Sequence, residues 1–159
     1  MLVTSPSKLA ALVGIFCFSL TPSTIWAEEE GSTAATRDIV MALFEAFNAQ
    51  DLDAVMALYH PDVAKINPDH PGPRVGREVV REIYSSIFQE MPGVQDIVRR
   101  IIAEGDQAAV EFTASWSLPG EDGTSMEQEL HIAAFIKIKD GRIIEDVTYY
   151  DRSPLPRAD

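Results

Sequence analysis

The chain is poor in cysteine, in basic residues and in histidine. Its 159 residues include one cysteine, three histidines and 13 lysines and arginines, against 25 acidic residues, for a net charge of −12. Nucleic acids and anionic membrane surfaces bind clusters of Lys and Arg, so this balance argues against both as partners. The sequence also lacks a phosphate-binding loop, a dinucleotide fingerprint and a serine nucleophile elbow. We therefore expect no cofactor.

Long apolar runs are also scarce, and the clearest one lies at the N-terminus. Leu9–Leu20 is almost uninterrupted, with Lys8 before it and Pro22 after it. Ile25-Trp26-Ala27 then offers a small residue at a cleavage point. This layout predicts a secretory signal peptide over residues 1–27, and so a periplasmic or secreted protein without membrane attachment after cleavage. An uncleaved anchor is the alternative, although the run is shorter than the roughly 20 apolar residues of a membrane span.

Cleavage at this point would also remove Cys17, the one cysteine. The mature chain would then have no disulfide, no cysteine nucleophile and no thiolate metal ligand. What remains is the right length for one domain, held together by its core alone. Small polar residues over 28–36 predict a flexible leader, residues 37–152 form the expected domain, and residues 153–159 form a loose tail.

Helical spacing of apolar residues predicts three helices in the first half of the domain. The first helix carries a wide apolar stripe from Ile39 to Phe47. Asp51 is expected to cap a second, short helix that ends with Tyr59 facing inward. A third helix covers Val79–Phe88, and the segment between the second and third helices, Val63–Asn67, predicts a short edge strand.

After Val94 the period of the apolar residues changes to two, which predicts four strands. The Asp140-Gly141 pair gives the clearest hairpin turn. Helices followed by a meander of strands predict an α+β fold, in which three helices cover one face of a curved antiparallel sheet. The expected strands are Gln95–Ala103, Ala108–Leu118, Met126–Lys139 and Arg142–Tyr150.

Strand alternation assigns the side chains to two faces of this sheet. The apolar face should pack on the helices, and the more polar face, which includes Asp146 and Thr148, should meet water or a partner subunit. Arg99, Tyr149 and Asp151 are polar residues on the apolar face, where a buried charge needs a partner. They form either a structural ion pair or a polar patch that orients a ligand. The apolar face is expected to carry Ile97, Arg99, Ile101, Val110, Phe112, Ala114, Trp116, Leu130, Ile132, Ala134, Val147, Tyr149 and Asp151.

Several short motifs occur in an order and at a spacing typical of one superfamily. The colinear set resembles the nuclear transport factor 2-like superfamily, and within it the ketosteroid isomerases and SnoaL-like polyketide cyclases. This resemblance covers the whole mature domain and implies a cone-shaped sheet, a pocket for a small hydrophobic molecule and a homodimer formed through the polar sheet face. The motifs are Asn48-Ala-Gln-Asp-Leu-Asp53, Asn67-Pro68, Pro73-Arg-Val-Gly76, Ala108–Trp116 and Gly141-Arg-Ile-Ile.

The residues that carry out catalysis in the isomerases are not present at the matching positions of this chain. The general base of the isomerases is the Asp before that proline, where this chain has Asn67, and an amide cannot shuttle a proton. The isomerases' two oxyanion donors fall on Leu43 and at or near Ala133, neither of which has a polar side chain. Steroid isomerisation by that mechanism is therefore not expected.

Asp151 and His60 remain as catalytic candidates. The ending Tyr149-Tyr150-Asp151 resembles the Tyr-aromatic-Asp ending of the last strand in limonene epoxide hydrolases, and SnoaL-like cyclases also place an acid on that strand. The catalytic acid falls either at Asp151 or in a register nearer Thr148. His60 lies in a Tyr-His-Pro-Asp turn, where it either bonds backbone groups or acts as a second acid–base group. The spacing of His60 and His70 matches no established ligand pattern, so no metal is predicted.

The sequence thus predicts an exported protein that binds a small hydrophobic, oxygenated molecule, as an isomerase, cyclase or hydrolase. The alternative is a non-catalytic dimerisation or ligand-carrier module whose pocket is filled by its own aromatic side chains. For Trp116, a purely structural place in the core is likewise the alternative to a ligand contact. The expected ligand-binding residues are Arg99, Trp116, Tyr149, Tyr59, Asn67 and Phe112.

Overall fold

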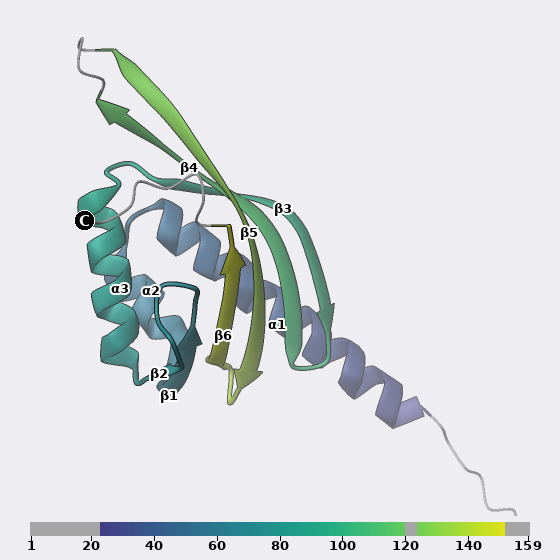
Figure 1. Cartoon of the computed structure of the whole chain (residues 1–159). Helices are drawn as coiled ribbons and strands as arrows, with labels where there is room; N and C mark the ends of the chain where they lie inside the picture. Colours follow the sequence, from purple (N-terminus) through teal and green to yellow (C-terminus); the bar gives the residue numbers. More distant parts are fainter. Residues whose placement is uncertain (1–22, 120–123, 152–159) are drawn as a thin grey trace, which may run out of the picture.

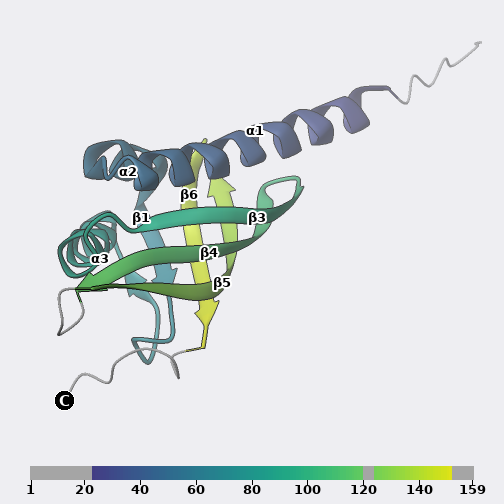
Figure 2. The same cartoon turned by 90° about the horizontal axis from the view of Figure 1, so that it is seen from above.

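Three helices and a six-stranded sheet make up the part of the chain that the computed structural model describes, residues 23–119 and 124–151. The strands follow the order β2-β1-β6-β5-β4-β3. Figures 1 and 2 show the long strands curving around the helices, with α1 crossing the sheet and extending past the β3–β4 turn. The predicted α+β architecture is confirmed. The elements are α1 (Ser23–Asn48), α2 (Leu52–Leu58), β1 (Tyr59–Ile66), β2 (Arg74–Val75), α3 (Arg77–Glu90), β3 (Gln95–Glu104), β4 (Gln107–Pro119), β5 (Ser125–Lys139) and β6 (Arg142–Tyr150).

Most element boundaries follow from local sequence signals. Asp51 caps α2 by accepting a hydrogen bond from Ala54 N at 2.9 Å, as predicted. Asp140 and Gly141 have φ values of 51° and 70°, which suit a two-residue hairpin turn with positive φ at both positions. All four predicted long strands are present, with ends that differ from the expected ones by at most one residue.

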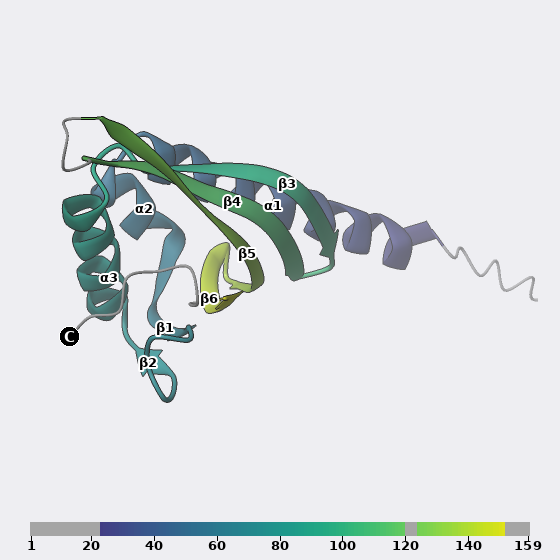
Figure 3. The same cartoon turned by 45° about the horizontal axis from the view of Figure 1, so that its top comes forward.

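The core fills the space between α1, α3 and the concave face of the sheet. Figure 3 shows how these backbone elements are arranged. Phe44 meets Phe112 edge to face, with ring centroids 4.9 Å apart, and so ties α1 to β4. Phe47 packs against Tyr84 of α3 at 5.7 Å. Aromatic pairs of this kind add about 0.5–1.5 kcal/mol beyond the burial of their area. They fix the two helices that form the walls of the interior.

The sheet is mixed, and β1 does not lie at its edge as predicted. β1 pairs in parallel with β6, with Lys65 beside Asp146, and pairs antiparallel with the short β2 on its other side. Two residues are too few to show a strand period, so the sequence pattern missed β2. The parallel pairing brings Lys65 and Asp146 together from segments far apart in the chain.

A bulge reverses the predicted side-chain directions in the first half of β3. The pairing with β4 shifts register between Val98 and Arg100, so Asp96 and Val98 point inward. Ile97 is 44% exposed and Arg99 is also exposed, so their assignment to the helix-facing side was wrong. An inserted residue inverts the alternation on one side of it.

The same error affects β6. Its pairing with β5 shifts register near Ile143, and Asp146, predicted to face outward, is only 2% exposed. Tyr149 is 57% exposed on the opposite face, and Asp151 lies exposed just past the end of the strand. The prediction that Val147, Tyr149 and Asp151 face the helices was therefore wrong. Strict alternation gives the wrong face after a bulge.

Residues 28–36, predicted as a flexible leader, lie within α1. Thr36 is 2% exposed, and its hydroxyl donates to Gly105 O at 2.8 Å. The amide of Gly105 in turn donates to Thr33 Oγ1 at 2.9 Å. These bonds anchor α1 to the β3–β4 turn, and such tertiary contacts commonly decide whether a segment of ordinary composition is helical.

Most of the predicted signal peptide and the predicted tail, residues 1–22 and 153–159, lie outside the described residues. Within the described ranges, no helix is long and apolar enough to span a membrane.

Replacing Thr36 with Val should lower the free energy of unfolding by about 1–3 kcal/mol, because the carbonyl of Gly105 loses its buried donor. Urea denaturation of the purified protein measures this change. Ser32→Ala, at an exposed position of the same helix, serves as the matched control and should change little. Equal stability of both variants would mean that this stretch behaves as the loose leader first expected.

Candidate functional site

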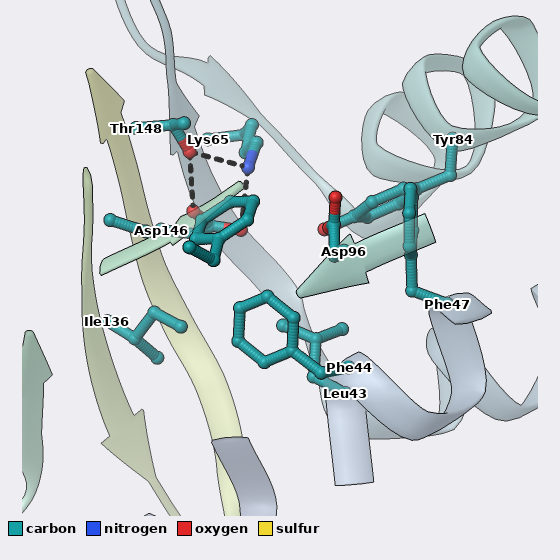
Figure 4. A pocket seen from close by; sticks show the side chains of 11 residues that line it. Leu43, Phe44, Phe47, Lys65, Tyr84, Asp96, Ile136, Asp146 and Thr148 are labelled. Atoms are coloured by element: carbon teal, nitrogen blue, oxygen red, sulfur yellow. Dashed lines mark hydrogen bonds and ion pairs between the residues drawn. The ribbon is translucent and has the colours of Figure 1, made fainter. Parts of the chain in front are cut away.

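A cavity lies between α1, α3 and the sheet (Figure 4). Its volume is about 30 Å³, which is room for one or two water molecules. The side facing α1, β4 and β5 is apolar and largely aromatic, whereas β1, β3 and β6 contribute charged and hydroxyl groups. The lining residues are Leu43, Phe44, Phe47, Lys65, Tyr84, Asp96, Phe112, Ala134, Ile136, Asp146 and Thr148.

A buried ion pair forms one polar wall of this cavity. Lys65 Nζ lies 2.7 Å from Asp146 Oδ2, and the two side chains are 9% and 3% exposed. The ammonium also donates to Thr148 Oγ1 at 3.1 Å, and the Thr148 hydroxyl donates to Asp146 Oδ1 at 3.1 Å. Thr148 follows Asp146 by two residues on β6 and therefore lies on the same face.

Two tyrosine hydroxyls complete the surroundings of Asp146. Tyr59 donates to Asp146 Oδ2 at 2.7 Å. The bond to Asp146 uses the only proton of the Tyr59 hydroxyl. The Tyr84 hydroxyl, 2.8 Å from the Tyr59 oxygen, must therefore be the donor in the bond between the two tyrosines. Burial, and next the charge of Asp146, raises the pKa of both tyrosines well above 10.0, so both are neutral hydroxyls. Asp146 thus accepts from Lys65, Tyr59 and Thr148.

Asp96 is the second carboxylate of the cavity, and its surroundings are different. Its backbone at the start of β3 is held by Asn48, whose amide side chain accepts from Asp96 N at 2.7 Å and donates to Asp96 O at 2.9 Å. Its carboxylate makes no hydrogen bond to any residue that the structure describes. Burial raises the pKa of Asp96 from 3.8 to about 7, although the Lys65 ammonium acts in the opposite direction.

The cavity therefore holds two carboxylates in unlike environments. Asp146 is fixed by an ion pair and two hydroxyl donors, whereas Asp96 faces the open space and changes charge close to neutral pH. Carboxylates held in different surroundings within one site are typical of acid–base chemistry. Among residues 23–119 and 124–151, no group of three His, Cys, Asp or Glu side chains is placed to hold a metal ion.

Among the predicted ligand-binding residues, Phe112 lines the cavity. Tyr59 is fully buried behind it and reaches it through its bonds to Tyr84 and Asp146. Trp116 is 6% exposed and belongs to the core. Asn67 lies past the end of β1, where its side chain accepts from the Asp69 amide at 3.2 Å.

The other predicted residues lie away from the cavity. His60 Nδ1 accepts from the Asp62 amide at 3.1 Å within its own turn. Arg99 lies on the outer face of the sheet, where its Nε donates to Thr113 Oγ1 at 3.3 Å. Tyr149 and Asp151 are exposed on or beyond β6. The structure therefore does not bring these residues together with the lining groups.

The sequence reasoning missed Lys65, Asp96 and Asp146. Lys65 could have been found, because it lies two residues after Val63 and so on the same face of β1, a polar residue in an inward position. Asp146 was assigned to the wrong face and Asp96 to neither face, and each belongs to a strand with a register shift.

The fold, with three helices beside a curved six-stranded sheet, is that of nuclear transport factor 2-like proteins. The sequence pattern of the SnoaL-like domain matches residues 40–146. The chain therefore belongs to the SnoaL-like domain family.

Solved structures of similar shape support this assignment. IdmH from Streptomyces antibioticus, a candidate polyketide cyclase, is 27% identical over 74% of this chain and 92% of its own, with a TM-score of 0.65. AclR from Streptomyces galilaeus, a candidate hydroxylase, is 22% identical over 78% and 83%, with a TM-score of 0.67. A candidate ketosteroid isomerase from Kribbella flavida is 22% identical over 80% and 92%, with a TM-score of 0.61. The last two show a shared fold alone.

Replacing Lys65 with Met should lower the free energy of unfolding by about 3–5 kcal/mol, because it leaves the Asp146 carboxylate buried without its cation. Denaturant unfolding of the variant measures the loss. Arg81→Met is the control, since Arg81 pairs with Asp53 on the surface, and it should change stability by less than about 1 kcal/mol. Similar losses in the two variants would contradict a central role for the buried pair.

Proposed function

We propose that this protein binds a small, largely hydrophobic molecule in the cavity and acts on it by proton transfer, with Asp96 as the group that takes up and returns the proton. The observation that carries this proposal is the Asp96 carboxylate, which faces an aromatic cavity without a hydrogen-bond partner among the described residues. A general acid–base group works best when its pKa is close to the working pH. The pKa of Asp96, raised to about 7 by burial, meets that condition.

The ion pair across the cavity supports the same function. An ammonium has three N–H donors, and Lys65 uses two of them on Asp146 and Thr148. The third remains for water or for a polar atom of the ligand. A bound molecule would thus meet a fixed cation on one side and a proton-exchanging carboxylate on the other.

A molecule larger than two waters must displace side chains to enter, because the cavity measures only about 30 Å³. Phe44 and Phe112 line it and are packed on each other, so they are the groups most directly affected. Proton transfer as the reaction and a small, largely hydrophobic molecule as the substrate are both part of this proposal. Export through the predicted signal peptide is part of it as well.

Replacing Asp96 with Asn should abolish turnover of the bound molecule, because an amide cannot exchange the proton. The same change should stabilise the fold at pH 8. A carboxyl whose pKa is raised on folding opposes folding once it ionises, so the wild type loses stability as the pH rises from about 4 to about 7, by at most about 4 kcal/mol. Asn removes this loss.

Native mass spectrometry of the gently purified protein identifies a bound molecule for the turnover assay, and urea denaturation at pH 5 and pH 8 follows stability. Asp62→Asn is the control, since its side chain is 84% exposed. Unchanged turnover in Asp96→Asn would refute the catalytic role. Binding without turnover in the wild type would favour a ligand carrier instead.

A dimerisation module is the second candidate function, favoured by the outer face of the sheet. Phe135 and Tyr149 are 53% and 57% exposed there and pack edge to face with centroids 6.1 Å apart. Ile102, 61% exposed, lies on the same rung of the sheet as Phe135. The ion pair of Arg100 and Glu111 adjoins them with both signs of charge, so a second copy related by a twofold axis would be complementary to it.

Replacing Phe135 with Glu should therefore give a monomer where the wild type is a dimer, because a charge would be buried at the centre of the contact. Light scattering coupled to size-exclusion chromatography measures the mass. Val75→Glu is the control, because Val75 is 62% exposed on the edge strand β2, which β1 separates from β6 and β5. A wild type that is monomeric at high concentration would rule the interface out.

A further inference from the structure

We infer that the molecule held at Asp96 carries a basic nitrogen, and that the cavity binds the protonated amine with Asp96 as its counter-ion. This inference rests on the proposed function and narrows its ligand to one chemical class. It follows from the charges, the hydrogen-bonding groups and the walls of the cavity.

The charges of the cavity do not balance without a ligand. Lys65 is the one cation among the described lining residues, and Asp146 neutralises it at 2.7 Å. When Asp96 is ionised, the site therefore has a net charge of −1. Burying an unpaired carboxylate is costly, and a monocation is the simplest ligand that restores neutrality.

The free hydrogen-bonding groups also favour a donor. The protons of Tyr59, Tyr84 and Thr148 are all used in the chain of bonds that ends on Asp146. Apart from the third N–H of Lys65, which stays free beside Asp146, the groups left over are the two carboxylate oxygens of Asp96 and a lone pair of Tyr84, which are acceptors. An ammonium, with N–H donors only, satisfies this arrangement.

The aromatic wall already accommodates one ammonium group. Lys65 Nζ lies 5.8 Å from the centroid of the Tyr84 ring, a distance at which a cation is attracted to the face of the ring. Phe44 and Phe47 supply further rings around the same space (Figure 4), and Phe112 also lines it. The cavity of about 30 Å³ matches an ammonium head group, which is close in size to a water molecule.

An anion fits this site poorly. It would have to take Lys65 from Asp146 and leave that carboxylate buried without its cation, and it would approach Asp96 as a like charge. A neutral alcohol avoids this repulsion but leaves the charge of Asp96 unbalanced. The expected order of affinity above neutral pH is therefore amine, then alcohol, then carboxylate.

Affinity for the amine should depend on pH in a defined direction. The ionisable groups that face Asp96 are Lys65 from β1, Asp146 from β6 and Tyr84 from α3, of which Asp146 pairs with Lys65 and Tyr84 stays neutral. Below the pKa of Asp96 a cation must displace its proton, so the affinity should fall roughly tenfold for each pH unit. Above it the affinity is constant until the amine itself loses its charge near about 10.4.

The test is an NMR titration of the wild-type protein with isobutylamine, isobutanol and isovalerate at pH 5.5, 7 and 8, at constant ionic strength. These molecules share a branched apolar body and differ in charge. The readout is the shift of the Asp96 amide and of the methyl signals of Leu43 and Ile136. At pH 8 we expect the amine to bind at least about tenfold more tightly than the alcohol, with the preference vanishing by pH 5.5.

Two variants complete the experiment. Asp96→Asn should bind amine and alcohol alike at every pH, whereas Asp62→Asn should keep the wild-type preference. Equal binding of amine and alcohol to the wild type at pH 8, or a preference for the amine that persists in Asp96→Asn, would overturn the inference of an amine ligand. The proposed function would then still stand with a neutral ligand. Tightest binding of isovalerate, or no binding of any probe at the cavity signals, would overturn the inference as well.

Discussion

The buried pair of Lys65 and Asp146 is the interaction on which the interior of this protein depends. It joins β1 to β6 where the two strands run in parallel, and it carries the hydroxyls of Tyr59 and Thr148 as further donors. Two charges removed from water gain little in net stability even when well paired, but each becomes very costly once its partner is lost. The pair therefore acts as a constraint: β1, β6 and the tyrosine of β1 must stay in one register, and that register shapes the cavity.

Asp146 and Asp96 illustrate how surroundings give two identical side chains different chemistry. Asp146 accepts from Lys65, Tyr59 and Thr148, so its carboxylate is held within the protein by three donors. Asp96 is fixed through its backbone by Asn48, while its carboxylate faces apolar side chains and the Lys65 ammonium, which bonds Asp146 instead. Lys65 thus forms its ion pair with Asp146, and Asp96 has no ion pair among the described residues. A group left in that state opposes folding at neutral pH, as is common at sites kept for function.

Much of the fold follows from sequence patterns that depend on neighbouring residues alone. The stripe on α1, the cap at Asp51 and the turn at Asp140-Gly141 are set within a few residues, and all three were predicted. The cavity was not, because its polar groups come from strands whose alternation is interrupted. Bulges in β3 and near the start of β6 turn Asp96 and Asp146 inward and Tyr149 outward. Where a bulge falls depends on the partner strand, which local periodicity does not contain.

The reversed side-chain directions in β3 and β6 also decide which residues supply the polar groups of the cavity. The sequence resemblance matches Leu43 and Asn67 to positions of reacting groups in the isomerases, and in the structure Leu43 lines the cavity as part of its apolar wall. The polar groups enter instead from β1, β3 and the middle of β6. Two proteins of one fold can have a cavity at the same place but draw its charged residues from different strands. Such cavities can bind different ligands although the fold is the same. For this protein the deciding feature is electrostatic: one cation, two carboxylates and an aromatic wall, with a single negative charge left for a ligand to neutralise.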